Sequence, residues 1–391
     1  MNPRYLLLMA VLAGCDPSAD GGPGSPLPPP PPEVTTPPIA AEVAVPADYG
    51  LHDTFVRDGI AFLCVWNTGI TILDVGGGGR NGTPEAPVLM STTHLSNGSL
   101  PSPAIHNSWW FHNATTGSRR YLFVGQEGPG LVGSTSGGDI KVVDVSDLSA
   151  PVEVAFFRTP DAGTHNFWVD EQRQVLYAAY YNEGVVAIDV SGTLTGDLAS
   201  REIARIRMSP TSYTWGVMLA NGRLYASDMV TGFWQLDPLT LHVIAGGNNV
   251  NERYGSDLWV RGNTGYSGTW GGSPREGQRG NALKIWHLSS SGAPAIADSI
   301  VIEGVYTISD VQVSDNGRLL VFSVEGPTDA GLYVYDLSAN VQKPVKVGYV
   351  NVVQGLHTVT LSRIGTRLYA FAAKNPVNPA LIIYDLSEYE R

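Results

Sequence analysis

The sequence predicts an all-β fold, a seven-bladed β-propeller of four-stranded blades that an N-terminal strand closes into a ring. One strand-turn-strand unit recurs seven times, opening at residues 52, 106, 165, 215, 256, 309 and 357, so neighbouring units start 41 to 59 residues apart. This period is typical of propeller blades. A low share of charged residues (15%), with 45 Gly and 27 Pro, also favours an all-β chain rich in turns.

The N-terminus, "MNPRYLLLMAVLAGC", is expected to be an export signal, with Arg4 as its charged end and an apolar run too short to span a bilayer. Its last four residues, Leu12 to Cys15, resemble the lipobox of bacterial lipoproteins. The resemblance implies removal of residues 1–14 and attachment of a diacylglycerol and an amide-linked chain such as palmitate to Cys15. Two such attachments suffice for stable anchoring in a membrane. An ordinary signal peptide with an incidental cysteine is the alternative.

Residues 15–39 are expected to form a Pro/Gly-rich tether without a fold, and residues 40–391 the propeller. The segment "AAEVAVPA" (40–47) resembles "APVEVAFF" (150–157), which is the expected fourth strand of another unit. The last unit has no fourth strand of its own before the sequence stops. We therefore expect residues 40–47 to complete the last blade and to cover its edge.

Each unit begins with a short polar or aromatic pair and runs through alternating β-strands. The pairs are His52-Asp53, His106-Asn107, His165-Asn166, Trp215-Gly216, Ser256-Asp257, Ser309-Asp310 and His357-Thr358. Second strands are expected at 61–66, 121–126, 175–180, 223–228, 319–324 and 368–373, and fourth strands at 150–158 and 343–352. Third strands are expected at 70–75, 140–145, 185–190, 233–238, 283–288, 332–337 and 381–386.

Six of the third strands close on an aspartate that precedes a turn. These residues are Asp74, Asp144, Asp189, Asp237, Asp336 and Asp385. An aspartate in this position caps local backbone amides, so we do not expect an acidic metal ring.

The stretches "GDIKVVDVSDLSAPVEVA" and "GVVAIDVSG" look like the LVIVD repeat of bacterial surface and exported proteins. The resemblance spans about residues 41–390 and implies a propeller, but no particular biochemical activity. Units four and five depart from the pattern, because Trp215 and Ser256 replace the opening histidine and His287 replaces the closing aspartate.

The opening pairs are the candidate ligand-binding residues, because the first strand of each propeller blade lines the central channel. The residues expected around the channel mouth are His52, Asp53, His106, Asn107, His165, Asn166, Trp215, Asp257, Asp310 and His357. Imidazoles that converge with carboxylates suit Zn, Fe or Cu, whereas oxygen ligands alone suit Ca²⁺. Three interpretations stay open: a polar lining of the channel wall, a bound metal or small ligand, and catalysis, for which no residue is assigned.

Five long segments are expected on the same face as the channel mouth, which we call the insertion-bearing face. They are 96–105, 127–139, 271–281, 325–331 and 374–380. An aromatic rim for a glycan or peptide could form there from Trp109, Trp110, Tyr213 and Trp215. Cys64 lies in an apolar strand pattern and is expected to be a buried thiol.

The net charge of −12 argues against nucleic acid or anionic lipid as a partner. The leading hypothesis is an exported, lipid-anchored, non-catalytic binding or scaffold module of the bacterial cell envelope, on the periplasmic side or the cell surface. Its partner would be an envelope protein or a polysaccharide at the insertion-bearing face. The alternative is a metal-binding protein or an enzyme, an oxidoreductase or hydrolase, that uses the channel mouth. No cofactor is expected beyond a possible divalent metal held by His52, His106, His165 and His357.

Overall fold

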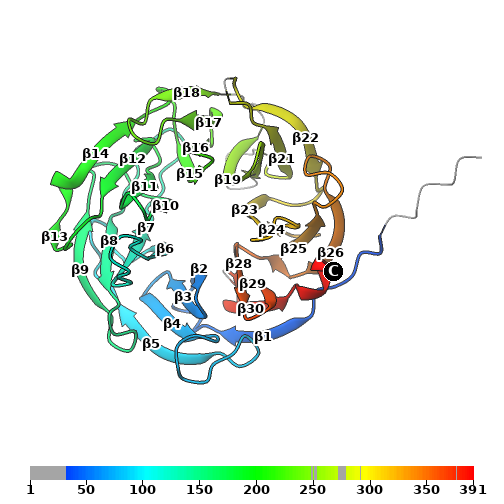
Figure 1. Cartoon of the computed structure of the whole chain (residues 1–391), viewed down its shortest axis with the longest axis horizontal. Coiled ribbons are helices and arrows are strands. Elements are labelled where there is room, and N and C mark those ends of the chain that lie inside the picture. Colours follow the sequence, from blue (N-terminus) through cyan, green and yellow to red (C-terminus); the bar gives the residue numbers. More distant parts are fainter. Residues whose placement is uncertain (1–31, 248–249, 251–252, 272–278, 291, 376) are drawn as a thin grey trace, which may run out of the picture. The chain divides into compact units, whose positions relative to one another are not determined.

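Antiparallel four-stranded sheets repeat around a ring in the computed structural model, which describes residues 32–247, 250, 253–271, 279–290, 292–375 and 377–391 (Figure 1). The predicted export signal, Cys15 and most of the predicted tether lie outside these residues. Within the described residues, no helix is long and apolar enough to cross a membrane.

The first three blades follow one another along the chain. Blade 1 contains β2 (Leu51–Arg57), β3 (Ile60–Val65), β4 (Gly69–Asp74) and β5 (Val88–His94). Blade 2 contains β6 (Ile105–Phe111), β7 (Tyr121–Gln126), β8 (Ile140–Asp144) and β9 (Val152–Phe157). Blade 3 contains β10 (Phe167–Asp170), β11 (Val175–Ala179), β12 (Val185–Asp189) and β14 (Glu202–Ile206), and the short β13 (Gly196–Asp197) pairs in parallel with β9.

The next three blades have the same order of strands. Blade 4 contains β15 (Thr214–Ala220), β16 (Arg223–Asp228), β17 (Gly232–Leu236) and β18 (Val243–Gly246). Blade 5 contains β19 (Tyr254–Arg261), β20 (Thr264–Trp270), β21 (Ala282–His287) and β22 (Ala295–Val301). Blade 6 contains β23 (Thr307–Val313), β24 (Leu319–Gly326), β25 (Gly331–Asp336) and β26 (Val345–Asn351), and the short β27 (Gln354–Gly355) pairs with the end of β24.

The seventh blade joins the two ends of the described chain. It contains β28 (Thr358–Ile364), β29 (Arg367–Lys374), β30 (Ala380–Asp385) and, as its outermost strand, β1 (Ile39–Ala44). β1 runs antiparallel to β30, with Glu42 opposite Ile382 and Ala44 opposite Ala380. The expected fold class is confirmed, although the closing strand starts one residue earlier than predicted and ends before Pro46, which has no amide hydrogen to donate.

The apolar core lies between neighbouring blades rather than at the centre of the ring. The second strands are buried on both faces, as in β3, β7 and β11. Between blades 1 and 2, for example, the rings of Phe62 and Trp110 lie 5.3 Å apart, and Cys64 is fully buried beside them, as expected. Each fully buried large apolar side chain contributes about 1.5–3 kcal/mol, so the blade interfaces supply most of the stability.

The closing aspartates cap turns, as the sequence predicts. Each of the six accepts at least one backbone amide hydrogen bond from a residue two positions further on. Asp74 accepts five, from Gly76, Gly77, Gly78, Arg80 and Gly82. The glycine run after Asp74 therefore supplies backbone amides that donate hydrogen bonds within this turn.

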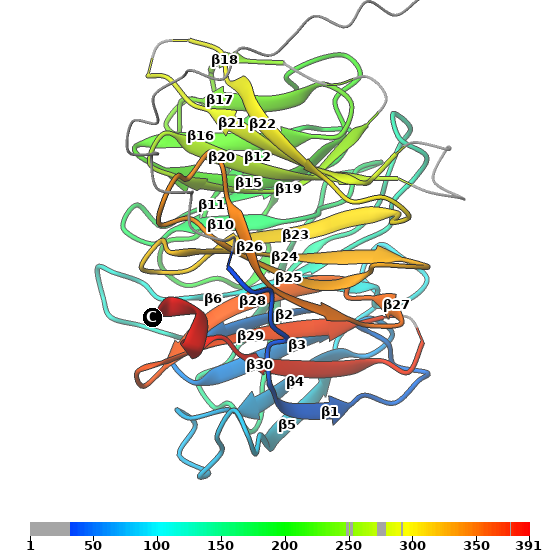
Figure 2. The ribbon, with the colours of Figure 1, turned by 90° about the vertical axis from the view of Figure 1, so that its right-hand side faces the viewer.

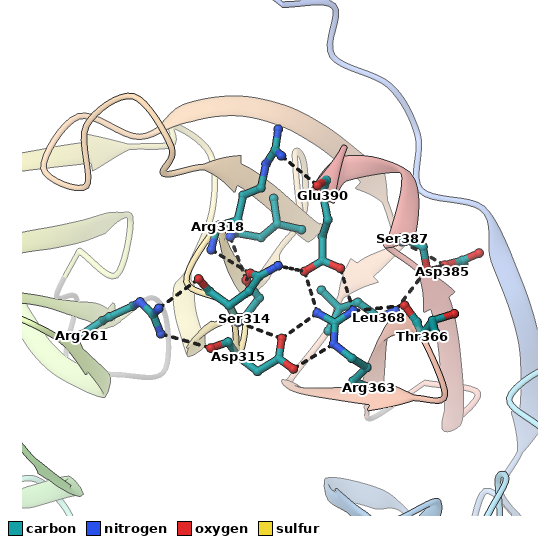
Figure 3. Close-up of polar contacts among 12 residues, drawn as sticks. Arg261, Ser314, Asp315, Arg318, Arg363, Thr366, Leu368, Asp385, Ser387 and Glu390 are labelled. Atoms are coloured by element: carbon teal, nitrogen blue, oxygen red, sulfur yellow. Dashed lines mark hydrogen bonds and ion pairs between the residues drawn. The ribbon is translucent and has the colours of Figure 1, made fainter.

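The C-terminal residues are fixed to the ring by charged side chains. The 3₁₀ helix η2 (Ser387–Glu390) and β27 lie on opposite faces of the ring when it is viewed edge-on (Figure 2). Nε and Nη2 of Arg363 donate to Asp315 at 2.8 and 2.7 Å, while Nη1 and Nη2 donate to Glu390 at 2.9 and 2.8 Å (Figure 3). We call Arg363, Asp315 and Glu390 the C-terminal clamp.

Candidate functional site

The first strands of the blades, β2, β6, β10, β15, β19, β23 and β28, surround the ring axis. In a regular strand successive side chains point to opposite faces, so only one residue of each opening pair would face the channel. Register shifts, the signature of β-bulges, interrupt the pairing at the openings of blades 1, 2, 4, 5 and 6. A bulge re-aims side chains locally. This explains how both members of a pair such as His106 and Asn107 reach the same channel.

Four imidazoles lie side by side on the channel wall, from blades 7, 1, 2 and 3. The ring centroids are 4.1 Å apart for His357 and His52, 4.3 Å for His52 and His106, and 4.0 Å for His106 and His165. The exposed fractions of His52, His106 and His165 are 7%, 3% and 3%. The structure thus brings together the four histidines that the sequence analysis grouped.

Glu127, the first residue after β7, places its carboxylate against three of these rings. Its Oε2 lies 3.7 Å from Nε2 of both His52 and His106, and its Oε1 lies 3.9 Å from Nε2 of His165. These separations are too long for hydrogen bonds between those atoms. The ligand atoms of His52, His106 and Glu127 all lie within 4.8 Å of one another, and no other such group of metal-ligating side chains occurs among the described residues. We call these four histidines and Glu127 the histidine cluster.

Hydrogen bonds fix the orientation of two of the imidazoles. Nδ1 of His165 lies 2.8 Å from the backbone oxygen of Trp215, so Nδ1 carries the proton and Nε2 keeps a lone pair. Nδ1 of His357 forms a hydrogen bond with the carboxylate of Glu325, and its Nε2 lies 2.9 Å from Nε2 of His52. A carboxylate behind a histidine is the arrangement that commonly orients metal-ligating imidazoles.

Burial disfavours the charged form of two imidazoles of this cluster, those of His106 and His165. Loss of hydration lowers the pKa of His165 to about 3, and the hydrogen bond that His165 donates to the backbone oxygen of Trp215 opposes this only in part. Loss of hydration, followed by repulsion from His165, His52 and His357, also lowers the pKa of His106 well below its usual value. Neutral imidazoles are the form that binds metals.

The cluster borders a cavity of about 230 Å³ on the side of the insertion-bearing face, which we call the histidine chamber. Its other walls are largely aromatic and apolar: Val132, Tyr181, Tyr213, Trp215, Met229 and Trp270. The hydroxyl of Tyr181 donates a hydrogen bond to Oε1 of Glu127. His52 and His357 also border a wider groove that is lined by Trp66, Tyr306, Val353 and Gln354 and that connects the cluster to the surface.

The three predicted carboxylates of the channel mouth line a second cavity. Asp53, Asp257 and Asp310 border a chamber of about 220 Å³ with Asn107 and Asn166, which we call the carboxylate chamber. The channel-facing sides of His106, His165 and His357 form part of its wall. The carboxylates nearest the imidazole nitrogens are therefore Glu127 and Glu325, and the aspartates of the opening pairs form a separate layer.

The four residues of the predicted aromatic rim lie in different environments. Tyr213 and Trp215 line the histidine chamber, as their place near an opening suggests. Trp109 lines the carboxylate chamber instead, and Trp110 packs between blades against Phe62 with an exposed fraction of 6%. The two tryptophans face opposite sides because they are successive residues of β6.

The sequence analysis missed Glu127, Tyr181 and Glu325. Glu127 directly follows β7, Glu325 lies at the end of β24, and Tyr181 follows β11 by one residue. Glu127 and Glu325 each lie across a hairpin from the opening of their own blade, as in the hydrogen bond from Tyr306 N to Glu325 O. Tyr181 instead bridges to Thr214 at the opening of the next blade. Pairing the end of each second strand with the opening residues was the signal that could have found them.

The inserted loops meet around the histidine cluster. Pro129, Gly130 and Val132 of the 127–139 segment border the histidine chamber, and residues of the 325–331 and 374–380 segments border the groove. Residues 272–278 of the 271–281 segment lie outside the described residues. The loops of this face thus form part of the walls of the histidine chamber and of the groove.

Comparison with known proteins identifies the fold. No family model matches the chain, and no curated protein matches its sequence. Among solved structures, the β-propeller domain of Myceliophteria thermophila Cps50 (Swd1) is similar, with a TM-score of 0.62, 10% identity, and coverage of 89% of this chain and 99% of that one. A chain of the mitotic checkpoint complex is also similar, with a TM-score of 0.61, 13% identity, and coverage of 91% of this chain and 96% of that one. At these identities the likeness establishes a β-propeller and nothing finer.

Proposed function

We propose that the histidine cluster binds one divalent transition-metal ion, with His52, His106 and Glu127 as its first ligands. The observation that carries this proposal is the set of distances between Nε2 atoms and the Glu127 carboxylate, 3.7, 3.7 and 3.9 Å. Ligands that each lie about 2.1 Å from one ion are separated by roughly 3 Å at right angles and by about 4.2 Å when opposite. The three distances fall within this interval and are too long for direct hydrogen bonds.

Two further imidazoles lie within reach of the same ion. The Nε2 atoms of His357 and His52 are 2.9 Å apart, close to the separation of two ligands at right angles, and Nε2 of His165 lies beside Glu127. Hydrogen bonds at Nδ1 direct the Nε2 lone pairs of His165 and His357 toward the cluster. Imidazole-rich sites with one carboxylate suit Zn²⁺ or Fe²⁺, and open positions on such ions support hydrolysis or oxidation.

Metal analysis of the purified protein tests this proposal. After loading with Zn²⁺ or Fe²⁺ and desalting, we expect about one ion per chain, which His106→Ala and Glu127→Gln should each reduce at least tenfold. The exposed His242 provides a matched control, and His242→Ala should retain the ion. Equal metal content in His106→Ala and His242→Ala would contradict the proposal.

A second candidate function, binding of an envelope protein or polysaccharide, is favoured by exposed apolar residues of the insertion-bearing face. Val353 and Leu131 have exposed fractions of 79% and 73%, and Val353 lies at the border of the groove. Apolar groups exposed beside a groove are typical of binding surfaces. Affinity capture from envelope extracts with the wild type and with Leu131→Ser/Val353→Ser checks this. Identical sets of captured partners would argue against this face.

We also propose that Cys15 anchors the propeller to the bacterial cell envelope through lipid. The support is the lipobox-like Leu12–Cys15 sequence followed by a proline-rich spacer. Fractionation of cells that express the wild type or Cys15→Ala tests it. Membrane retention of the Cys15→Ala protein would rule out this anchor.

A further inference from the structure

The carboxylate chamber brings three acidic side chains close to three imidazoles of the histidine cluster, with neither lysine nor arginine among the described residues of its wall. The acidic side chains are those of Asp53, Asp257 and Asp310. Negative charge confined by protein walls is focused into the chamber.

The hydrogen-bond partners of these carboxylates carry no positive charge that would balance them. The amide of Asn166 donates to Asp257 at 2.9 Å, the backbone N–H of Val359 donates to Asp310 at 3.0 Å, and that of Thr54 donates to Asp53 at 2.7 Å. Loss of hydration and repulsion from Asp257 and Asp53 raise the pKa of Asp310 well above its usual value. A raised pKa means that the Asp310 carboxyl readily takes up a proton, and a cation close to it would favour the charged form.

Aromatic rings form the wall beyond the carboxylates. Phe55, Trp109, Trp168 and Trp259 each occur three residues after an opening residue, in blades 1, 2, 3 and 5. Their ring centroids follow one another at 5.3, 5.0 and 6.1 Å, and all four rings are half-buried at the chamber. The face of an aromatic ring attracts cations, and tryptophan does so most strongly.

We propose that the carboxylate chamber binds a small organic cation with an alkylammonium group, whose charge faces Asp257 and Asp310 and whose alkyl groups lie against Trp109, Trp168 and Trp259. An inorganic ion fits less well, because the three aspartates do not bring ligand atoms within 4.8 Å of one another as His52, His106 and Glu127 do. The aromatic walls also offer nothing to replace the water shell of such an ion. This site shares wall residues with the histidine cluster, but the proposed contacts of the cation are with other side chains, so the proposal does not depend on a bound metal.

Calorimetric titration of the full chain, freed of metal with EDTA, tests the proposal. Choline is the probe, and 3,3-dimethylbutan-1-ol, which has the same shape without the charge, is the control ligand. We expect choline to bind at least about tenfold more tightly than the alcohol. Asp257→Asn/Asp310→Asn and Trp168→Leu should each weaken choline binding about tenfold or more, whereas Glu388→Gln, at the exposed surface, should leave it unchanged.

Each alternative has a distinct outcome. Equal affinities for choline and the alcohol would show an apolar site and overturn the proposal, and so would no heat of binding with either ligand. Displacement of choline by low concentrations of Ca²⁺ or Na⁺ would show an inorganic ion site instead. The double asparagine variant relieves like-charge repulsion, so thermal unfolding should show a melting temperature at least equal to that of the wild type. Loss of choline binding in that variant would then not be caused by loss of the fold.

Discussion

At the scale of single residues, Asp74 and Glu127 show two opposite uses of a carboxylate. Asp74 is 1% exposed, and burial acts to raise its pKa, but hydrogen bonds from several backbone amides together outweigh burial and lower the pKa to about 2. Its turn needs glycine at one close approach, where a side chain on Gly77 would lie 1.8 Å from the backbone oxygen of Asp58. Glu127 instead meets imidazole nitrogens and a tyrosine hydroxyl beside a cavity, where a metal ion could bind. The two carboxylates therefore differ in their hydrogen-bond partners and surroundings, since both are buried.

The amide cap of Asp74 should make a pH-dependent contribution to stability. Its pKa in the folded protein, about 2, lies below the unfolded value of 3.8, so the contribution is present above about pH 4 and is lost as the pH falls toward 2. Asp74→Asn should therefore lower the free energy of unfolding by about 2 kcal/mol at pH 7 and by much less near pH 2.5. Urea unfolding at several pH values measures this. Asp48→Asn, at an exposed aspartate, is the control, and a loss that does not vary with pH would contradict the electrostatic origin.

At the scale of elements, the sequence predicted the strands well because their pattern is local. Alternation and the closing aspartates marked third strands such as β4 and β12, and the turn caps followed from the residues next to them. The site was harder to predict. Bulges at the openings turn both members of a pair toward the channel, and Glu127 reaches His165 only through the contact between blades 2 and 3. Neither fact is visible from the spacing of residues within one unit.

The C-terminal clamp should stabilise the junction of blades 6 and 7. Arg363 forms paired hydrogen bonds with Asp315 and with Glu390, a geometry that the single ammonium of lysine cannot reproduce. Arg363→Lys should lower the free energy of unfolding by about 1 kcal/mol, even though the charge is retained.

Arg119→Lys provides the matched control for the clamp. Arg119 contacts Asp58 at 2.7 Å, but its side chain is 56% exposed and such pairs contribute little. Urea unfolding should therefore show a larger loss for Arg363→Lys than for Arg119→Lys. Equal losses would mean that the clamp is no stronger than a surface ion pair.

At the scale of the whole molecule, closure of the ring depends on contacts between the two ends of the described chain. Thr35 bridges to Gly348 of β26, Pro38 accepts a hydrogen bond from Asp385, and β1 then covers β30. Ala41 and Val43 of β1 pack against the core that blades 7 and 1 share. The histidine cluster takes His357 from blade 7 and His52 from blade 1, so the geometry of the proposed metal site depends on this same closure.

Removal of the closing strand should therefore open the ring and disturb the cluster together. A chain that lacks residues 1–45 should melt at least about 5 °C below the wild type and should associate, because the edge of β30 would be left unpaired. A chain that lacks only residues 1–32 keeps β1 and is the control. If the longer truncation does not fold, Val43→Asp, which places a charge in the contact with blades 7 and 1, should lower the melting temperature by a smaller amount. Thermal unfolding and light scattering measure both effects, and equal melting temperatures for all variants would show that the ring stays closed without this strand.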